Sequence, residues 1–216
     1  MKKIGIAILA LLVLAVATLV LFQERIGAAL FERAADRGAS VDTLAGLPDG
    51  LHLGLCGTGS PLPNPQRAGP CNVVIAGDRV FVVDIGEGGN RNIALMGINA
   101  GKIEALLLTH FHSDHIDGLG PLMLFHWTRG ASTSPLAVYG PAGVDKVIEG
   151  FDAAYAQDNT YRTAHHGEEI APTSGGGGEA RPFDMAGDTA VVIDDGGLKV
   201  TAFAVDHFPV QADNFK

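Results

Sequence analysis

Clusters of basic side chains are missing from this chain. It has 15 lysines and arginines against 24 aspartates and glutamates, which gives a net charge of −9 at pH 7. Proteins that follow a phosphate backbone usually present a basic stripe, and no segment here forms one. This argues against a nucleic-acid partner, although an acidic protein can still hold a local basic site. The glycine-rich stretch at residues 173–179 lacks the lysine and following helix of a P-loop. We therefore expect it to be a flexible loop that lies over the candidate functional site described below.

Cysteine is scarce as well. The two cysteines, Cys56 and Cys71, flank a proline-rich segment, and their spacing is unlike that of a zinc knuckle. If the strands on either side pair, the thiols come close enough for a disulfide in an oxidising compartment. Two buried free thiols are the alternative, and the sequence leaves both open.

Charge is absent from the residues that follow Lys2 and Lys3. Ile4 to Phe22 form an uncharged, mostly apolar run, which as a helix would span about 28 Å of a hydrocarbon core of about 30 Å. The only Ala-x-Ala in the N-terminal region lies inside the run, so we predict an uncleaved signal anchor at residues 1–22. The two lysines favour a cytoplasmic N-terminus. We therefore expect anchoring in the inner membrane, with the catalytic domain periplasmic or otherwise extracytoplasmic.

The rest of the chain predicts a short juxtamembrane helix with a linker at residues 23–50 and one α/β domain at residues 51–216. Within that domain, strand-like and helix-like segments alternate, which is typical of layered α/β architecture. The predicted strands are 51–56, 71–84 with a turn at Gly77-Asp78, 102–109, 136–139, 190–193 and 198–205, and the predicted helices are 90–101, 116–127 and 143–157.

Potential metal ligands gather in the segment 110–115, His-Phe-His-Ser-Asp-His, directly after an apolar strand-like run. In an extended chain alternate side chains share a face, so His110 and His112 can reach one ion. A turn at Ser113 would bring Asp114 and His115 to a second ion beside the first. Imidazole and carboxylate ligands suit zinc, with iron and manganese as alternatives.

This HxHxDH pattern resembles the signature of the metallo-β-lactamase superfamily. Further segments resemble landmarks of its ribonuclease Z-like and arylsulfatase-like branch, in the expected order, at residues 55–61, 84–88, 139–141 and 205–210. The resemblance implies the first half of an αββα sandwich.

The resemblance also implies a binuclear zinc site. His207 is its expected third ligand on the first metal, beside His110 and His112, with an open position at which the pKa of a bound water falls towards about 7. Asp114 and His115 are the expected ligands of the second metal, and Asp114 is the expected catalytic carboxylate that steers the attacking hydroxide.

The resemblance also implies a role for Asp84, and it implies two further ligands near the C-terminus. Asp84 is expected to orient the ligand loop by hydrogen bonds, the alternative being a plain turn residue. The family pattern has a bridging aspartate and a last histidine after the third ligand. No histidine follows His207, and Asp213 is too close to it to take the bridging position. We therefore expect a chain truncated at its C-terminus. Completion by another polypeptide and a degraded enzyme are the alternatives.

Together these observations predict a metal-dependent hydrolase with two zinc ions, acting on a phosphate, sulfate or carboxylate ester of a small, anionic substrate, as in the arylsulfatase-like branch. A ribonuclease Z-like endonuclease that processes the 3′ end of tRNA is the first alternative, against which acidity and the predicted export argue. An inactive, truncated metal-binding fragment is the second. The oligomeric state, including a homo-oligomer, is left open.

Overall fold

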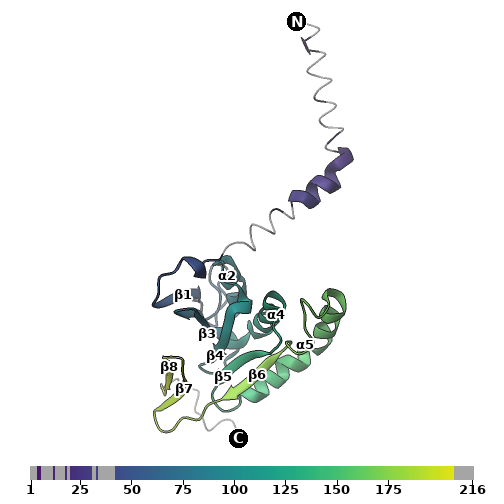
Figure 1. Cartoon of the computed structure of the whole chain (residues 1–216). Helices are drawn as coiled ribbons and strands as arrows, with labels where there is room; N and C mark the ends of the chain where they lie inside the picture. Colours follow the sequence, from purple (N-terminus) through teal and green to yellow (C-terminus); the bar gives the residue numbers. More distant parts are fainter. Residues whose placement is uncertain are drawn as a thin grey trace. The chain divides into compact units, whose positions relative to one another are not determined.

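The computed structural model of this chain describes residues 4–5, 12, 18, 20–30, 33 and 42–206. The chain divides into two units, residues 1–42 and residues 43–216. In the first unit, residues 20–30 are helical. The second unit contains all the strands and the other helices described below (Figure 1).

The structure corrects the predicted localisation. Among the described residues, no helix is long and apolar enough to cross a membrane. We had predicted an inner-membrane anchor at residues 1–22 with the catalytic domain outside the cytoplasm. Most of that segment lies outside the described residues.

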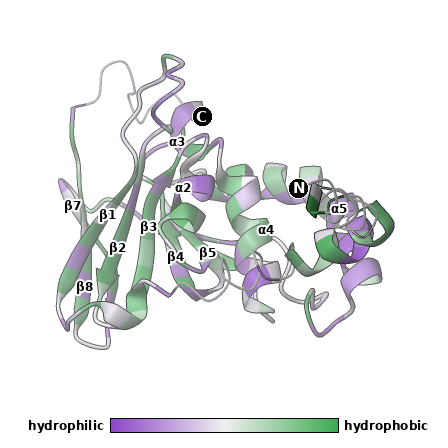
Figure 2. Ribbon diagram, turned by 90° about the horizontal axis from the view of Figure 1, so that it is seen from above, coloured by the Kyte–Doolittle hydropathy of each residue, from purple (hydrophilic) through white to green (hydrophobic). Residues whose placement is uncertain are grey.

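A six-stranded mixed sheet forms the centre of the second unit, with its strands in sequence order. The first three strands are antiparallel, and the last three run parallel to the third. Most of these strands are rich in apolar residues, as the green colour in Figure 2 shows. The strands are β1 (Leu51–Gly57), β2 (Cys71–Ala76), β3 (Arg79–Ile85), β4 (Ile103–Leu107), β5 (Leu136–Gly140) and β6 (Gly178–Pro182).

Helices cover one face of this sheet, because each parallel connection needs a crossover. They are α2 (Gly89–Leu95), α3 (Ser113–Ile116), α4 (Leu119–Gly130) and α5 (Val144–His166), with short 3₁₀ turns η1 (Leu44–Gly46) and η2 (Ala100–Lys102). Ile93 of α2, Leu122 of α4 and Ile148 of α5 belong to one buried cluster together with Val82 and Leu106 of the sheet. This cluster is the main core of the second unit.

A two-stranded sheet, β7 (Thr189–Asp195) and β8 (Leu198–Phe203), packs on the other face of the large sheet. Ile193 of β7 is buried in one cluster with Phe81 and Ala105. The Arg79 guanidinium reinforces this contact, since it pairs with Glu104 of β4 and donates to Asp195 Oδ1 at 2.6 Å. The predicted α/β class is confirmed, with a mixed sheet between these two layers.

The glycine-rich segment corrects another expectation. It is close-packed backbone and not a flexible loop over the site. A Cβ at Gly175 would lie 1.6 Å from the Ser132 carbonyl oxygen, and Gly177 has a φ of +91°. The amide of Gly178, where β6 begins, donates to Asp152 Oδ1 at 3.0 Å. The glycines are therefore needed for close approach and for a left-handed turn.

Candidate metal centre

The candidate ligands lie where two parallel strands end. β3 and β4 are neighbours in register, with Val83 opposite Leu107, so Asp84 and the segment 109–115 emerge at the same edge of the sheet. Phe111 packs against the turn after β5, where Cβ atoms added at Gly140 and Gly143 would lie 3.4 Å and 3.5 Å from its ring. In extended backbone the side chains of His110 and His112, on either side of Phe111, point to the face opposite the Phe111 ring.

Asp84 is the centre of the hydrogen bonds at this edge. It is 5 % exposed and has a φ of +55°, in the left-handed region that Asp tolerates better than most residues. Its Oδ1 accepts the Thr109 amide at 2.8 Å, and its Oδ2 accepts the Thr109 hydroxyl and the His115 Nδ1–H at 2.8 Å each. Such strained, over-determined backbone is characteristic of functional sites.

The contact with Asp84 sets the orientation of His115. A carboxylate only accepts, so Nδ1 of His115 carries the proton of this bond, and the neutral ring has its lone pair on Nε2. The hydrogen bond to Asp84 raises the pKa of His115, helped by the charges of Asp84 and Asp114, while partial burial lowers it. A carboxylate behind a histidine in this way is a common support for a metal ligand.

The histidines are close enough to share ions. His110 Nε2 lies 3.0 Å from His112 Nδ1, and two nitrogens on one tetrahedral zinc, each at about 2.0–2.1 Å, are about 3.3 Å apart. His115 Nε2 lies 3.7 Å from Asp114 Oδ2, and the rings of His110 and His115 are 4.1 Å apart between centroids. The two pairs, His110 with His112 and Asp114 with His115, therefore lie side by side.

The donors and their spacings fit a divalent metal such as zinc, but the described residues do not complete a site. Among them, no three His, Cys, Asp or Glu side chains converge closely enough to hold an ion. His207, the expected third ligand, lies outside the described residues, as does Asp213. The structure brings together His110, His112, Asp114, His115 and Asp84.

A disulfide closes the loop beside this centre. Cys56 and Cys71 are bonded and fully buried, which decides between the two alternatives that the sequence left open. The end of the enclosed loop packs on the glycine turn after β3, where the Gly69 amide donates to the Glu87 carbonyl at 2.9 Å. A Cβ at Gly86 would lie 2.2 Å from the Asp114 carbonyl oxygen. Loop, glycine turn and ligand segment are thus in direct contact.

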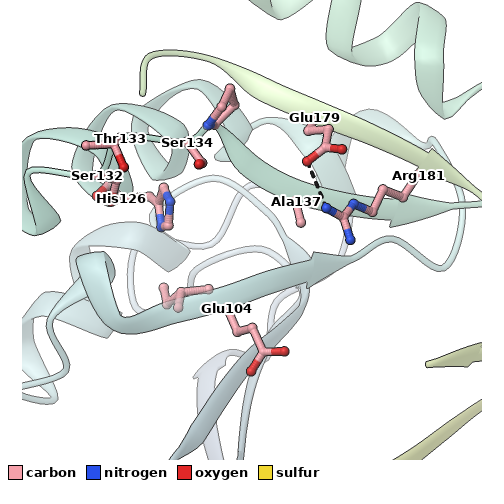
Figure 3. Close-up of a pocket in the computed structure, with 10 residues that line it drawn as sticks. Glu104, His126, Ser132, Thr133, Ser134, Ala137, Glu179 and Arg181 are labelled. Atoms are coloured by element: carbon pink, nitrogen blue, oxygen red, sulfur yellow. Dashed lines mark hydrogen bonds and ion pairs between the residues drawn. The ribbon is translucent and has the colours of Figure 1, made fainter. Parts of the chain in front are cut away.

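A hollow of about 440 Å³ lies away from this centre, near the starts of β4 and β5 (Figure 3). Residues 132–135 and His126 line it together with charged side chains. These charges are paired, Glu104 with Arg79 and Glu179 with Arg181. Among the residues that the structure describes, none of the candidate metal ligands lines this hollow.

His126 predicts a pH dependence of stability. Burial lowers the pKa of His126, and the nearby backbone groups of Ala100, Ser134 and Ile103 reverse part of this decrease. Its buried Nδ1 has no hydrogen-bond partner among the described residues. At His126 the folded chain therefore binds fewer protons than the unfolded chain below about pH 6.5, so the contribution of His126 to stability should fall as pH drops below that value. We expect urea unfolding of His126→Gln to lose less stability between pH 7 and pH 5 than wild type loses. An equal loss would contradict this.

Other histidines lie elsewhere. His165 and His166 are exposed at the end of α5, with ring centroids 4.6 Å apart. The start of α5 is the end near Phe111, and the helix is about 33 Å long. His165 and His166 therefore lie at the end of α5 that is far from Phe111.

Sequence reasoning missed Thr109, whose hydroxyl lies 2.9 Å from His110 Nδ1. A hydroxyl residue directly before the first ligand was the available signal.

Comparisons with known proteins show the family of this chain. The family described as the metallo-beta-lactamase superfamily matches residues 65–202. Ribonuclease Z of Mycobacterium marinum (strain ATCC BAA-535 / M) is 38% identical over 163 residues, 74% of this chain and 56% of that protein. Ribonuclease Z of Mycobacterium sp. (strain KMS) is 40% identical over 162 residues, 74% of this chain and 54% of that protein. The chain thus spans about half the length of these curated relatives.

A solved structure supports the fold. The crystal structure of human tRNase Z, short form, aligns with a TM-score of 0.52 at 23% sequence identity. The alignment covers 70% of this chain and 59% of that one. At this identity the likeness concerns the fold alone.

Proposed function

This chain belongs to the metallo-β-lactamase superfamily, as its motifs predicted, and the hydrolase class is confirmed with it; on this premise we propose that it acts as a ribonuclease Z-like endonuclease on tRNA precursors. The observation that carries the proposal is the cluster centred on Asp84, in a chain whose curated relatives described above are ribonucleases Z. This replaces the arylsulfatase-like hydrolase of small esters, which we had favoured from the sequence.

The metal ligands of the proposed enzyme follow the two pairs described above. We propose that His110 and His112, with His207, hold one zinc ion, and that Asp114 and His115 hold a second. When bound, such a pair of ions supplies Lewis acidity and a nucleophile at neutral pH. Asp84 accepts the hydrogen bond from His115 Nδ1, so the lone pair of this ring lies on Nε2, on the side away from Asp84. The Asp114 carboxylate orients the nucleophile.

Two exposed cations near the glycine turn offer contacts for an RNA backbone. The Arg91 guanidinium lies beside Gly88, 3.1 Å from where a Cβ would stand, and Ala68, next to Arg67, lies 3.2 Å from the same point. Neither arginine takes part in an ion pair with any residue that the structure describes. The predicted export, corrected above, no longer weighs against tRNA. A net charge of −9 still allows such a local pair of cations.

Cleavage of RNA against cleavage of a small ester tests the proposal. The purified 216-residue chain, supplied with zinc, is incubated with a precursor tRNA that carries a 3′ extension and, separately, with an aryl sulfate. We expect the RNA to be cut near the end of the acceptor stem and the sulfate to remain intact. Sulfate hydrolysis without RNA cleavage would restore the small-ester function.

Salt dependence of RNA binding tests the arginines. If Arg91 contacts a phosphate, Arg91→Ala should weaken binding and reduce the slope of log K against log salt by about one. Lys146→Ala, which removes an exposed positive charge on α5, is the matched control and should leave the slope unchanged. Equal slopes for both variants would remove Arg91 from the interface.

A further inference from the structure

We propose that Thr109 is a positioning residue whose hydroxyl links Asp84 to His110 and turns the His110 Nε2 lone pair towards the metal. The proposal rests on the metal centre proposed above. Thr109 lies two residues after the end of β4 and is exposed, so its hydroxyl is not required to fill the core. Its hydrogen bonds nevertheless join a buried carboxylate to the first ligand.

The direction of each bond follows from counting protons. The Thr109 Oγ1 lies 2.8 Å from Asp84 Oδ2 and 2.9 Å from His110 Nδ1. A carboxylate has no proton to give, so the single hydroxyl proton goes to Asp84. The contact with His110 then needs a proton on Nδ1. The neutral His110 ring therefore carries its lone pair on Nε2.

This arrangement gives both ligand pairs one anchor. Asp84 holds His115 directly through Oδ2 and holds His110 through the Thr109 hydroxyl. Both rings are fixed with the proton on Nδ1 and the lone pair on Nε2. One buried carboxylate thus orients an imidazole in each pair. Replacing Thr109 by valine removes the link to His110 through the hydroxyl and leaves the direct bond between Asp84 and His115.

A consequence follows for His112. With a lone pair on His110 Nε2, the proton in its 3.0 Å contact with His112 Nδ1 belongs to His112. For both nitrogens to hold one ion, His112 would have to release the Nδ1 proton to solvent and take up a solvent proton on Nε2, so His112 should carry its proton on Nε2 in the loaded protein. His110 should keep the same tautomer in both states.

Nitrogen-15 NMR of the imidazoles in metal-free protein at pH 8 tests the proposal, together with zinc affinity measured by competition with a chelator. Thr109→Val keeps the shape and removes the hydroxyl; Thr109→Ser keeps the hydroxyl. We expect Thr109→Val to abolish the preference of His110 for a proton on Nδ1 and to weaken zinc binding about 10–100-fold. Thr109→Ser should restore both.

Controls separate this role from packing and from the proposed function. Thr128→Val removes a hydroxyl that bonds within α4, from Thr128 Oγ1 to the Leu124 carbonyl at 2.8 Å, and should change neither readout. Unchanged tautomer and affinity in Thr109→Val, or a Thr109→Ser variant as defective as Thr109→Val, would overturn the proposal. The tautomer is measured without metal or RNA, so a chain that cuts no RNA would refute the nuclease function and leave this test intact.

Discussion

Replacing Asp114 by alanine should lower the rate of RNA cleavage about 10³-fold, or about 4 kcal/mol in the activation free energy. The Asp114 carboxylate lies 3.7 Å from His115 Nε2, and the two side chains form the second donor pair. Its removal takes away a proposed ligand and the group that orients the nucleophile. Single-turnover cleavage with saturating zinc measures the effect, because it separates the chemical step from product release.

Asp117→Ala is the matched control for this variant. Asp117 is an exposed carboxylate directly after α3, and its backbone amide, which an alanine keeps, donates to the Ser113 carbonyl at 2.8 Å. The control should cut RNA at nearly the wild-type rate. A loss of less than about tenfold in Asp114→Ala would show that Asp114 neither binds a needed ion nor orients the nucleophile.

Removing the disulfide should lower the free energy of unfolding by about 3 kcal/mol, the value expected for a closed loop of about 15 residues. Cys56 and Cys71 are separated by 15 residues, and both side chains are fully buried. Urea unfolding of Cys56→Ala/Cys71→Ala against wild type under oxidising conditions measures the difference. Because the enclosed loop packs on the glycine turn beside Asp114, we also expect weaker zinc binding.

A dithiol reductant supplies the control. Two electrons and two protons convert the bond to two thiols, so reduced wild type should approach the stability of the double variant, and the variant itself should not respond. Two titratable thiols in unreduced, denatured wild type would contradict the disulfide. So would equal urea midpoints for oxidised and reduced protein.

Much of the fold could be predicted because its strands are short, apolar and separated by clear turns. Gly77-Asp78 separates β2 from β3 where the sequence predicted a turn, and β4 lies within the predicted 102–109. Helix ends were less predictable. The left-handed Gly97, with a φ of +72°, follows the end of α2, whereas the predicted helix continued to 101. α5 continues to His166, where an Arg162–Asp158 pair at 2.7 Å supports the added turns.

The candidate site was predictable where it is local and unpredictable where it depends on contacts distant in sequence. The segment 110–115 places four donors within six residues, so alternation and one turn were enough to predict two pairs. The strained Asp84 and its bond to Thr109, 25 residues later, depend on the register of β3 and β4. The packing of Gly175 depends on Ser132 in the same way, and net charge does not report on where Arg91 lies.

Zinc content of the purified, dialysed 216-residue chain tests the central claim most directly. Elemental analysis of wild type and of His110→Ala/His112→Ala, prepared side by side, measures it. We predict that wild type retains zinc at one to two ions per chain and that the double variant loses at least one of them, with its circular dichroism unchanged. Wild type without zinc, or a folded double variant with the full wild-type content, would contradict the claim that these histidines form a metal centre.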